Sequence, residues 1–311
     1  MAHELRFLAM DLPNRPWSEL LRRYQHIEAL GFDLAGVADH FVDWTGAPGP
    51  WFEAWTLLAA VARETTTVRL ATWVTQFPLR NPALLARQAL TVDHISDGRL
   101  ELGLGIGLTT DPSCEMMGIP NWNAKERVAR FKEYVEIVDR LMSNEVTTYK
   151  GKFYEVDGAV IDPRPVQQPR PPIIIGAMGP VMLKCAARFA DTWNSGLSGA
   201  STFDAALVET RDRIRLVDEH CAVIGRDPAS LRRSCLMSVR ERLRGGMFGC
   251  YESAEVFADM MQRLIDLGIS EVGIWYPVRD EQLPVFEKIA AEVIPALKEK
   301  HAARTRHRRG T

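Results

Sequence analysis

His40 is the side chain of this sequence that is best placed to transfer a proton. It follows Asp39 directly, just after the apolar run 33–38, which predicts a short buried strand. A segment rich in Trp, Gly and Pro comes next, from Trp44 to Trp51. Ligands of α/β proteins bind beyond the carboxyl ends of parallel strands, so we expect His40 to face a pocket and act as a general acid or base beside Asp39. The alternative is a histidine packed in an ordinary loop.

A glycine-rich strand is predicted over residues 99–107. Because side chains alternate along a strand, Gly103, Gly105 and Gly107 share one face, and leucine and isoleucine occupy the other. The glycine face lacks the side chains that would fill an interior, which predicts room for a flat ligand; tight packing alone is the alternative. The dinucleotide fingerprint is excluded, because Leu108 stands where GxGxxG needs a glycine.

A small-residue turn follows the predicted buried strand 172–176 and leads into a helix. Backbone N–H groups at such a helix start bind anions, and in barrels a phosphate is commonly held on this late part of the rim. An ordinary turn between strand and helix is the alternative. The predicted phosphate contacts are Gly176, Ala177, Met178, Gly179 and Pro180.

Short β-like runs alternate with longer helical patterns along the chain, which is the order of parallel βαβ units. Eight predicted strands, each followed by a helix, favour a closed (β/α)8 TIM barrel over an open doubly wound sheet. Residues 146–156 predict an inserted β-hairpin, and 163–172 form a Pro-rich connector. We expect one domain over 1–300 and a disordered basic tail over 301–311. The predicted strands are 5–10, 33–38, 68–75, 99–106, 172–176, 192–195, 234–239 and 271–276.

Composition restricts the classes of partner. The chain of 311 residues is 46% apolar and 25% charged, and its net charge of −2 comes from well-mixed signs, which argues against a nucleic-acid or membrane partner. The five cysteines form no CxxC pair, which indicates a reducing compartment and excludes a Cys-based zinc site. No HxH or HExxH spacing suggests a metal. We therefore expect a cytoplasmic protein that acts on a small molecule.

Several motifs together resemble one known family, the luciferase-like monooxygenases, over nearly the whole chain up to about Lys300. The resemblance implies a (β/α)8 barrel that binds FMN or the deazaflavin coenzyme F420 at its upper rim. The motifs are Ala38-Asp39-His40-Phe41, Arg80-Asn81-Pro82 with 83–87, Asp93-His94-Ile95-Ser96-Asp97-Gly98-Arg99 leading into 103–107, 176–180, and Ala187-Arg188-Phe189-Ala190-Asp191-Thr192-Trp193-Asn194.

Within this family, Asp39-His40-Phe41 followed by Trp44 looks like the deazaflavin-dependent sugar-phosphate and alcohol dehydrogenases. In those enzymes the matching histidine gives or takes the proton and the matching tryptophan lines the substrate site. They carry a glutamate directly after the glycine strand, where this chain has Leu108-Thr109. The resemblance also implies a non-prolyl cis peptide within 72–74, between Trp73 and Val74. The cofactor contacts it implies, besides 176–180, are Asp39, Thr72, Trp73, Val74, Gly105 and Gly107.

The sequence thus predicts an F420-dependent oxidoreductase that moves a hydride between the deazaflavin C5 and a small organic substrate, with His40 handling the proton. One alternative is an FMN-dependent monooxygenase that uses O2 and takes reduced flavin from a partner reductase. A second is a flavin-binding protein without turnover. A metal-dependent barrel hydrolase would need ligands at several strand ends, which the seven histidines do not supply. The resemblance further implies a homodimer.

Overall fold

The computed structural model describes residues 3–43, 49–197, 200–237 and 247–309. The chain divides into two compact units, and neither is one continuous segment. The terminal unit comprises Met1–Asp11, His26–Ala35 and Ala177–Thr311, and the central unit comprises Leu12–Gln25 and Gly36–Gly176. Helix α1 (Trp17–Ala29) and strand β2 (Leu34–Val37) each begin in one unit and end in the other. The expectation of a single domain over 1–300 stays a prediction.

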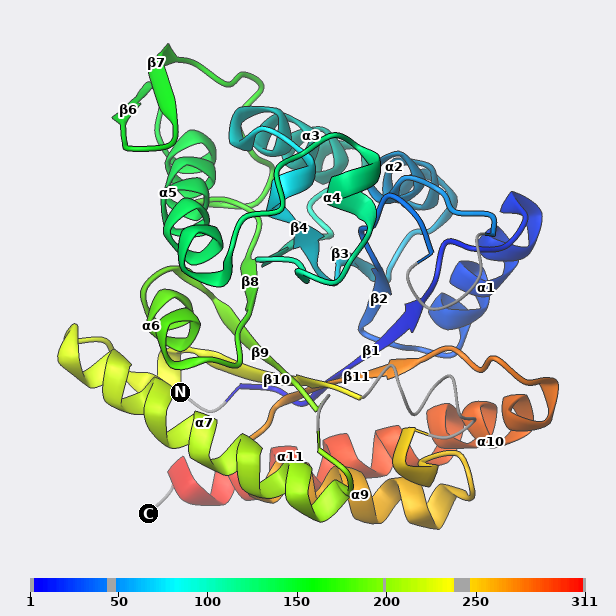
Figure 1. The fold of residues 1–311 in the computed structure, drawn as a ribbon. Coiled ribbons are helices and arrows are strands. Elements are labelled where there is room, and N and C mark those ends of the chain that lie inside the picture. The colour runs from blue at the N-terminus through cyan, green and yellow to red at the C-terminus, as the bar shows by residue number, and fades with distance from the viewer. Residues whose placement is uncertain (1–2, 44–48, 198–199, 238–246, 310–311) are drawn as a thin grey trace. The chain divides into compact units, whose positions relative to one another are not determined.

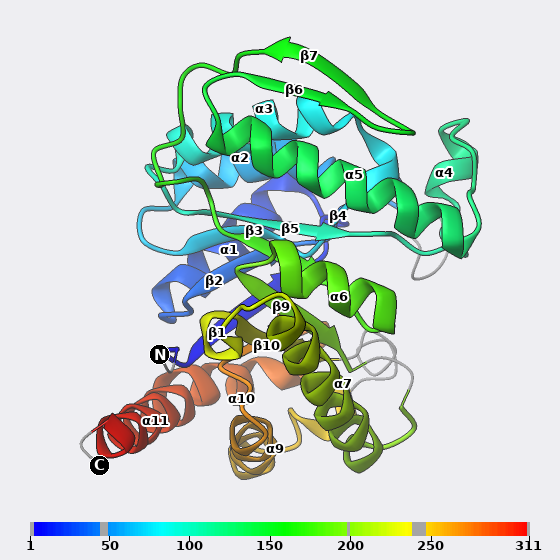
Figure 2. The ribbon, with the colours of Figure 1, turned by 90° about the vertical axis from the view of Figure 1, so that its left-hand side faces the viewer.

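The strands of the terminal unit are parallel and run in the order β1, β11, β10, β9. Their register sets Glu271 opposite both Arg6 and Ser234. Helices follow the strands along the chain, and Figure 2 shows α7 and α9 on the outer side of these strands. The elements are β1 (Arg6–Asp11), α6 (Pro180–Phe189), β9 (Thr192–Gly196), α7 (Phe203–Val223), β10 (Arg232–Leu236), α9 (Ala254–Asp266), β11 (Glu271–Trp275), α10 (Leu283–Lys288) and α11 (Ile294–Arg309).

The central unit is built around β5, which pairs in parallel with β3, β4 and β8. Its helices begin at polar caps: the side chain of Glu53 accepts from the first amides of α2, and Asn81 and Asn123 do the same for α3 and α5. These caps fix where each helix starts after the loop that precedes it. The elements are α2 (Ala54–Glu64), β3 (Arg69–Thr72), β4 (Thr75–Gln76), α3 (Pro82–Ile95), β5 (Leu100–Gly105), α4 (Ser113–Met116), α5 (Ala124–Ser143) and β8 (Ile173–Gly176).

The inserted hairpin is confirmed. Strands β6 (Thr147–Lys150) and β7 (Glu155–Ala159) are antiparallel and lie beside α5 in Figure 1. Glu133 of α5 ties down their turn by accepting the amides of Lys152 and Phe153 at 3.0 and 2.9 Å. The chain then returns to β8 through the predicted Pro-rich connector.

Eight parallel strands, counting β4 as the continuation of β3, alternate with helices, so the predicted (β/α)8 fold class is confirmed. Each predicted strand overlaps one of them. The prediction of a disordered tail over 301–311 is wrong for 301–309, which belong to α11, and 310–311 lie outside the described residues. His301 Nε2 lies 3.0 Å from the carbonyl of His3, and Arg304 donates to Asp266 at 2.7 Å. These polar contacts hold the last turns of α11 against the protein, although the residues of these turns are too polar to pack as core. None of the described helices is long and apolar enough to cross a membrane.

Candidate active site

The structure gives His40 a partner that lies 71 residues along the chain. His40 follows β2, and its Nδ1 hydrogen-bonds to Oδ2 of Asp111, which lies in the loop between β5 and α4. The other oxygen of Asp111 accepts the backbone amide of Ser113 at 2.7 Å. The Asp111 side chain is 1% exposed and that of His40 is 11% exposed, so the pair is largely shielded from water.

Gln76 determines which nitrogen of the ring carries the proton. Its side-chain Nε2 donates to the carbonyl of Asp39 at 3.1 Å and to Asp111 Oδ2 at 2.7 Å. These bonds use both amide hydrogens, so the 2.7 Å approach of Nε2 to His40 Nδ1 is not a bond to a nitrogen lone pair. Nδ1 therefore bears the hydrogen that His40 donates to Asp111. Nε2 is the ring nitrogen at which a proton can be exchanged with a ligand.

The surroundings of Asp111 favour its ionised form. Burial alone would raise the pKa of this carboxyl, but the hydrogen bonds from His40 and Ser113 hold it well below its usual range. An ionised carboxylate behind the ring can only accept hydrogen bonds, so it keeps the hydrogen on Nδ1 and stabilises a protonated imidazole. The pair has the composition of a general acid–base unit with its orienting group.

The carboxylate bonded to His40 Nδ1 is that of Asp111, whereas the neighbouring Asp39 faces Arg80. The Asp39 carboxylate forms a bidentate ion pair with Arg80, whose Nη2 lies 3.0 Å from Oδ1. It also accepts a hydrogen bond from the backbone N–H of Gln76 at 3.2 Å. Arg80 reaches Glu53 at 3.1 Å as well. Burial alone would lower the pKa of Arg80, but the hydrogen bonds and charge of Asp39 raise it. Asp39 and His40 are adjacent in sequence, yet consecutive side chains in an extended segment point in different directions.

Trp51 lies against His40. Its indole Nε1 donates to the His40 carbonyl at 2.7 Å, and the two rings meet edge to face with centroids 6.0 Å apart. The side chain is partly exposed. Trp44, the predicted substrate contact, lies outside the described residues. An aromatic residue in a loop that follows a histidine-bearing strand end was the sequence signal that could have drawn attention to Trp51.

The cis peptide between Trp73 and Val74 is confirmed. The glycine face of β5, however, is filled by this segment instead of being open space. A Cβ built on Gly103 would lie 1.9 Å from the Thr72 carbonyl oxygen, and one on Gly105 would lie 2.4 Å from a Val74 methyl group. The glycines are needed because residues 72–74 approach this face closely, with backbone at Gly103 and with a side chain at Gly105. The prediction of empty room is therefore wrong, whereas the proposed contacts of these residues with a cofactor stay predictions.

Two further positions suit a bound cofactor. Val74 is partly exposed between buried neighbours, and its methyl groups rest over Gly103, Gly105 and Gly176, which gives a firm apolar support for a flat ring. Gln76 Oε1 is buried without a hydrogen-bond partner among the described residues, and it can accept from a ligand. The residues present therefore fit a flavin-like group.

The part of the predicted phosphate turn that lies in the terminal unit, 177–180, has the features of an anion site. Gly179 is the N-cap of α6, where it provides no side-chain cap, and Pro180 opens the helix. A Cβ built on Gly179 would meet no described atom within 4 Å. The amide of Ala177 is already bonded to the Asn194 carbonyl at 3.0 Å. The roles of Gly176, Ala177, Met178, Gly179 and Pro180 stay predictions.

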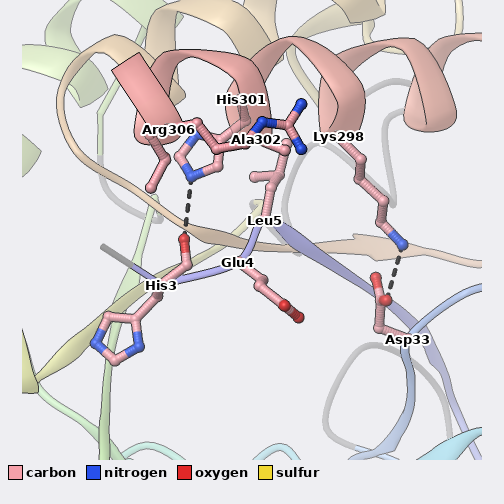
Figure 3. Close-up of a pocket in the computed structure, with 9 residues that line it drawn as sticks. His3, Glu4, Leu5, Asp33, Lys298, His301, Ala302 and Arg306 are labelled. Atoms are coloured by element: carbon pink, nitrogen blue, oxygen red, sulfur yellow. Dashed lines mark hydrogen bonds and ion pairs between the residues drawn. The ribbon is translucent and has the colours of Figure 1, made fainter. Parts of the chain in front are cut away.

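A cavity of about 410 Å³ lies at the amino end of β1 in the terminal unit and does not contain His40. Figure 3 shows two contacts in its lining: Lys298 donates to Asp33 at 2.8 Å, and His301 contacts the His3 carbonyl. These contacts tie α11 to β1, as expected for the end of a barrel that serves stability. We assign this cavity no catalytic role.

Comparison with known proteins identifies the family to which this chain is similar. Residues 4–240 match the family model described as luciferase-like monooxygenase. An F420-dependent glucose-6-phosphate dehydrogenase from Segniliparus rotundus is 32% identical over 219 residues, which cover 68% of this chain but only 62% of that protein. The enzyme of the same name from Intrasporangium calvum is 27% identical over 321 residues and covers 90% of this chain and 95% of its own.

Solved structures share the fold. The coenzyme F420-dependent tetrahydromethanopterin reductase from Methanopyrus kandleri superposes with a TM-score of 0.77 at 19% identity, over 94% of this chain and 99% of its own. The oxygenating constituent of 3,6-diketocamphane monooxygenase from Pseudomonas putida, solved with FMN, gives 0.69 at 17% identity, over 94% and 99%. At these identities the likeness concerns the (β/α)8 fold alone. Because the family model spans most of the sequence, the chain belongs to the luciferase-like monooxygenase family.

Proposed function

We propose that this protein is an oxidoreductase that uses coenzyme F420 and acts on a small organic substrate. The observation that carries the proposal is the His40–Asp111 pair, because hydride transfer to or from an alcohol or carbonyl carbon is accompanied by movement of a hydroxyl proton. The curated relatives that bear the name of F420-dependent dehydrogenases support the choice of cofactor. When bound, the deazaflavin supplies or accepts the hydride.

The residues of the chain have separate tasks in this proposal. His40 takes the proton of the substrate hydroxyl at Nε2, or returns it in the reverse direction. Asp111 and Gln76 hold the ring in the tautomer that makes this possible. Val74 supports the ring of the cofactor, with Asp39, Thr72, Trp73, Gly105 and Gly107 around it, and the turn 176–180 holds the phosphate. Trp51, and Trp44 by the resemblance, line the substrate side.

A titration of the purified protein with oxidised F420 and, separately, with FMN tests the cofactor assignment. We expect F420 to bind more tightly and the loaded protein to reduce it with a suitable alcohol. Tighter binding of FMN, together with O2 consumption when reduced flavin is supplied by a reductase, would replace this function with that of a monooxygenase. Binding of either cofactor without turnover of any substrate would favour a flavin-binding protein.

We also propose that the protein is a homodimer, as the resemblance implies, and that it is cytoplasmic, as its composition indicates. Sedimentation equilibrium gives the test, and a mass equal to that of one chain at micromolar concentration would contradict the dimer.

A further inference from the structure

The two loops that carry His40 and Asp111 contain no lysine or arginine. They are residues 38–53, between β2 and α2, and 106–123, between β5 and α5. Apart from His40, all the charged or titratable side chains of the Lys, Arg, Asp and Glu types in these loops are therefore acidic. These acids are Asp39, Asp43, Glu53, Asp111 and Glu115.

Three arginines of the central unit reach these loops, and each is already engaged. Arg80 is paired with Asp39 and its side chain is 8% exposed. Arg127 is 1% exposed and donates to the carbonyl of Ile106 at 2.8 Å. Arg130 donates to the carboxylate of Glu126 at 2.9 Å, and its guanidinium lies over the ring of Trp122. A phosphate near His40 would have to be desolvated beside these loops without a cation from them.

Large apolar side chains occupy several of the exposed positions of the same loops, among threonine, asparagine and glutamate residues that are also exposed. Phe41 is 53% exposed, Leu108 49%, Met116 57% and Met117 39%. The two loops are joined directly, because the Phe41 amide donates to the hydroxyl of Ser113 at 3.0 Å. Large apolar side chains that are left exposed on loops carrying a potential proton-transfer group are consistent with a binding site for an apolar ligand. Methionine adds a flexible surface that adapts to ligands of different shape.

We propose that the ligand held next to His40 is an uncharged, largely apolar alcohol or ketone, and not a sugar phosphate. This inference rests on the proposed function for the kind of reaction, but it concerns a binding preference that can be measured without turnover. It also gives a physical meaning to Leu108-Thr109, which provide an apolar and a neutral polar side chain at the loop that begins after β5.

Calorimetric titration with a series of straight-chain secondary alcohols of increasing length, and with glucose 6-phosphate, tests the proposal. The protein is titrated alone and after saturation with F420 or with FMN. We expect the alcohol affinity to rise about fourfold for each added methylene until the site is filled, which is the gain from burying one CH2 group. Glucose 6-phosphate should bind more weakly than the longest alcohols.

A charge-introducing variant sharpens the test. Leu108→Lys should weaken alcohol binding roughly tenfold and strengthen that of glucose 6-phosphate. The matched control is Val160→Lys, which makes a similar change at a 60% exposed position after the hairpin and should alter neither affinity. Affinity that does not increase with chain length, glucose 6-phosphate binding tighter than every alcohol, or no alcohol binding in any of the three states would overturn the proposal. The cofactor titration decides the proposed function separately.

Discussion

Two regions of the described structure hold histidine and carboxylate side chains near one another but differ in what these atoms are bonded to. In the central unit, beyond the carboxyl end of β2, the imidazole of His40 is bonded to the carboxylate of Asp111. In the terminal unit, at the amino end of β1, His301 is bonded to a backbone carbonyl and Asp33 to Lys298. The first arrangement controls a proton on a ring, whereas the second fastens a helix to a strand. Residue type alone does not separate catalysis from stability, but the bonding partners do.

The largest expected contrast is between the two histidines. His40→Ala should lower kcat by roughly two to four powers of ten, the usual contribution of a positioned general acid or base, and leave cofactor affinity nearly unchanged. His301→Ala, the matched control, should leave kcat alone and slightly lower the melting temperature. Steady-state kinetics, cofactor titration and thermal melts on both variants give the comparison. Equal kcat for the wild type and His40→Ala would remove the catalytic assignment.

The carboxylates should differ in the same way. Asp111→Asn keeps the shape of the side chain but loses the charge behind His40, so kcat should fall by about one to two powers of ten and the acid limb of the pH–kcat profile should move to lower pH. Asp33→Asn removes the ion pair with Lys298 and should affect stability alone. A kcat profile of Asp111→Asn that differs from wild type in height but not in position along the pH axis would indicate a purely structural role for Asp111.

Two glycines offer a contrast between ligand binding and packing. Gly179→Val should raise the cofactor Kd about tenfold without a loss of stability, because its side chain enters space that no described atom fills and blocks a phosphate at the start of α6. Gly105→Val should instead destabilise the protein, because its Cβ would collide with Val74. Fluorescence titration and thermal melts distinguish the two. Unchanged cofactor affinity in Gly179→Val would count against the phosphate site.

The smallest effect concerns acid stability. Burial, followed by the charges of Arg232 and Arg6, lowers the pKa of His3 from 6.5 to about 4. The unfolded chain therefore takes up this proton before the folded protein does, and folding stability falls as the pH falls through that window. The Asp111 carboxylate affects folding stability at lower pH. Its stabilising contribution is present above the ordinary carboxyl pKa near 3.8 and is lost as the pH falls below that value.

His3→Asn should remove the loss between pH 6.5 and 4, which amounts to about 2 °C or less in melting temperature because the ring is half exposed and its interactions are screened. Melting temperatures of both proteins are compared across this range. Parallel curves for the variant and the wild type would show that His3 does not titrate in this way.

The sequence by itself determined the alternation of strands and helices, because hydrophobic periodicity and cap residues are local properties of the chain. Helix α3, Pro82–Ile95, has the bounds that its pattern suggests, with Asn81 as its cap. The place of His40 after a strand is local in the same sense, and the family resemblance supplied the cis peptide after Trp73. The helical order of residues 301–309 could not be predicted from local pattern, because it depends on contacts with His3 and Asp266.

Only the tertiary structure decided the partners in the site. Asp111 lies in a loop without periodicity, so nothing in the sequence links it to His40. The neighbouring carboxylate, Asp39, turns to Arg80 instead. The glycines of β5 leave space that Thr72 and Val74 fill. This close approach also depends on which segments meet in the folded protein. Periodicity fixes the path of the backbone within each element, whereas the bonds between loops depend on how distant elements pack, and this packing is what turns an ordinary loop histidine into a candidate acid–base group.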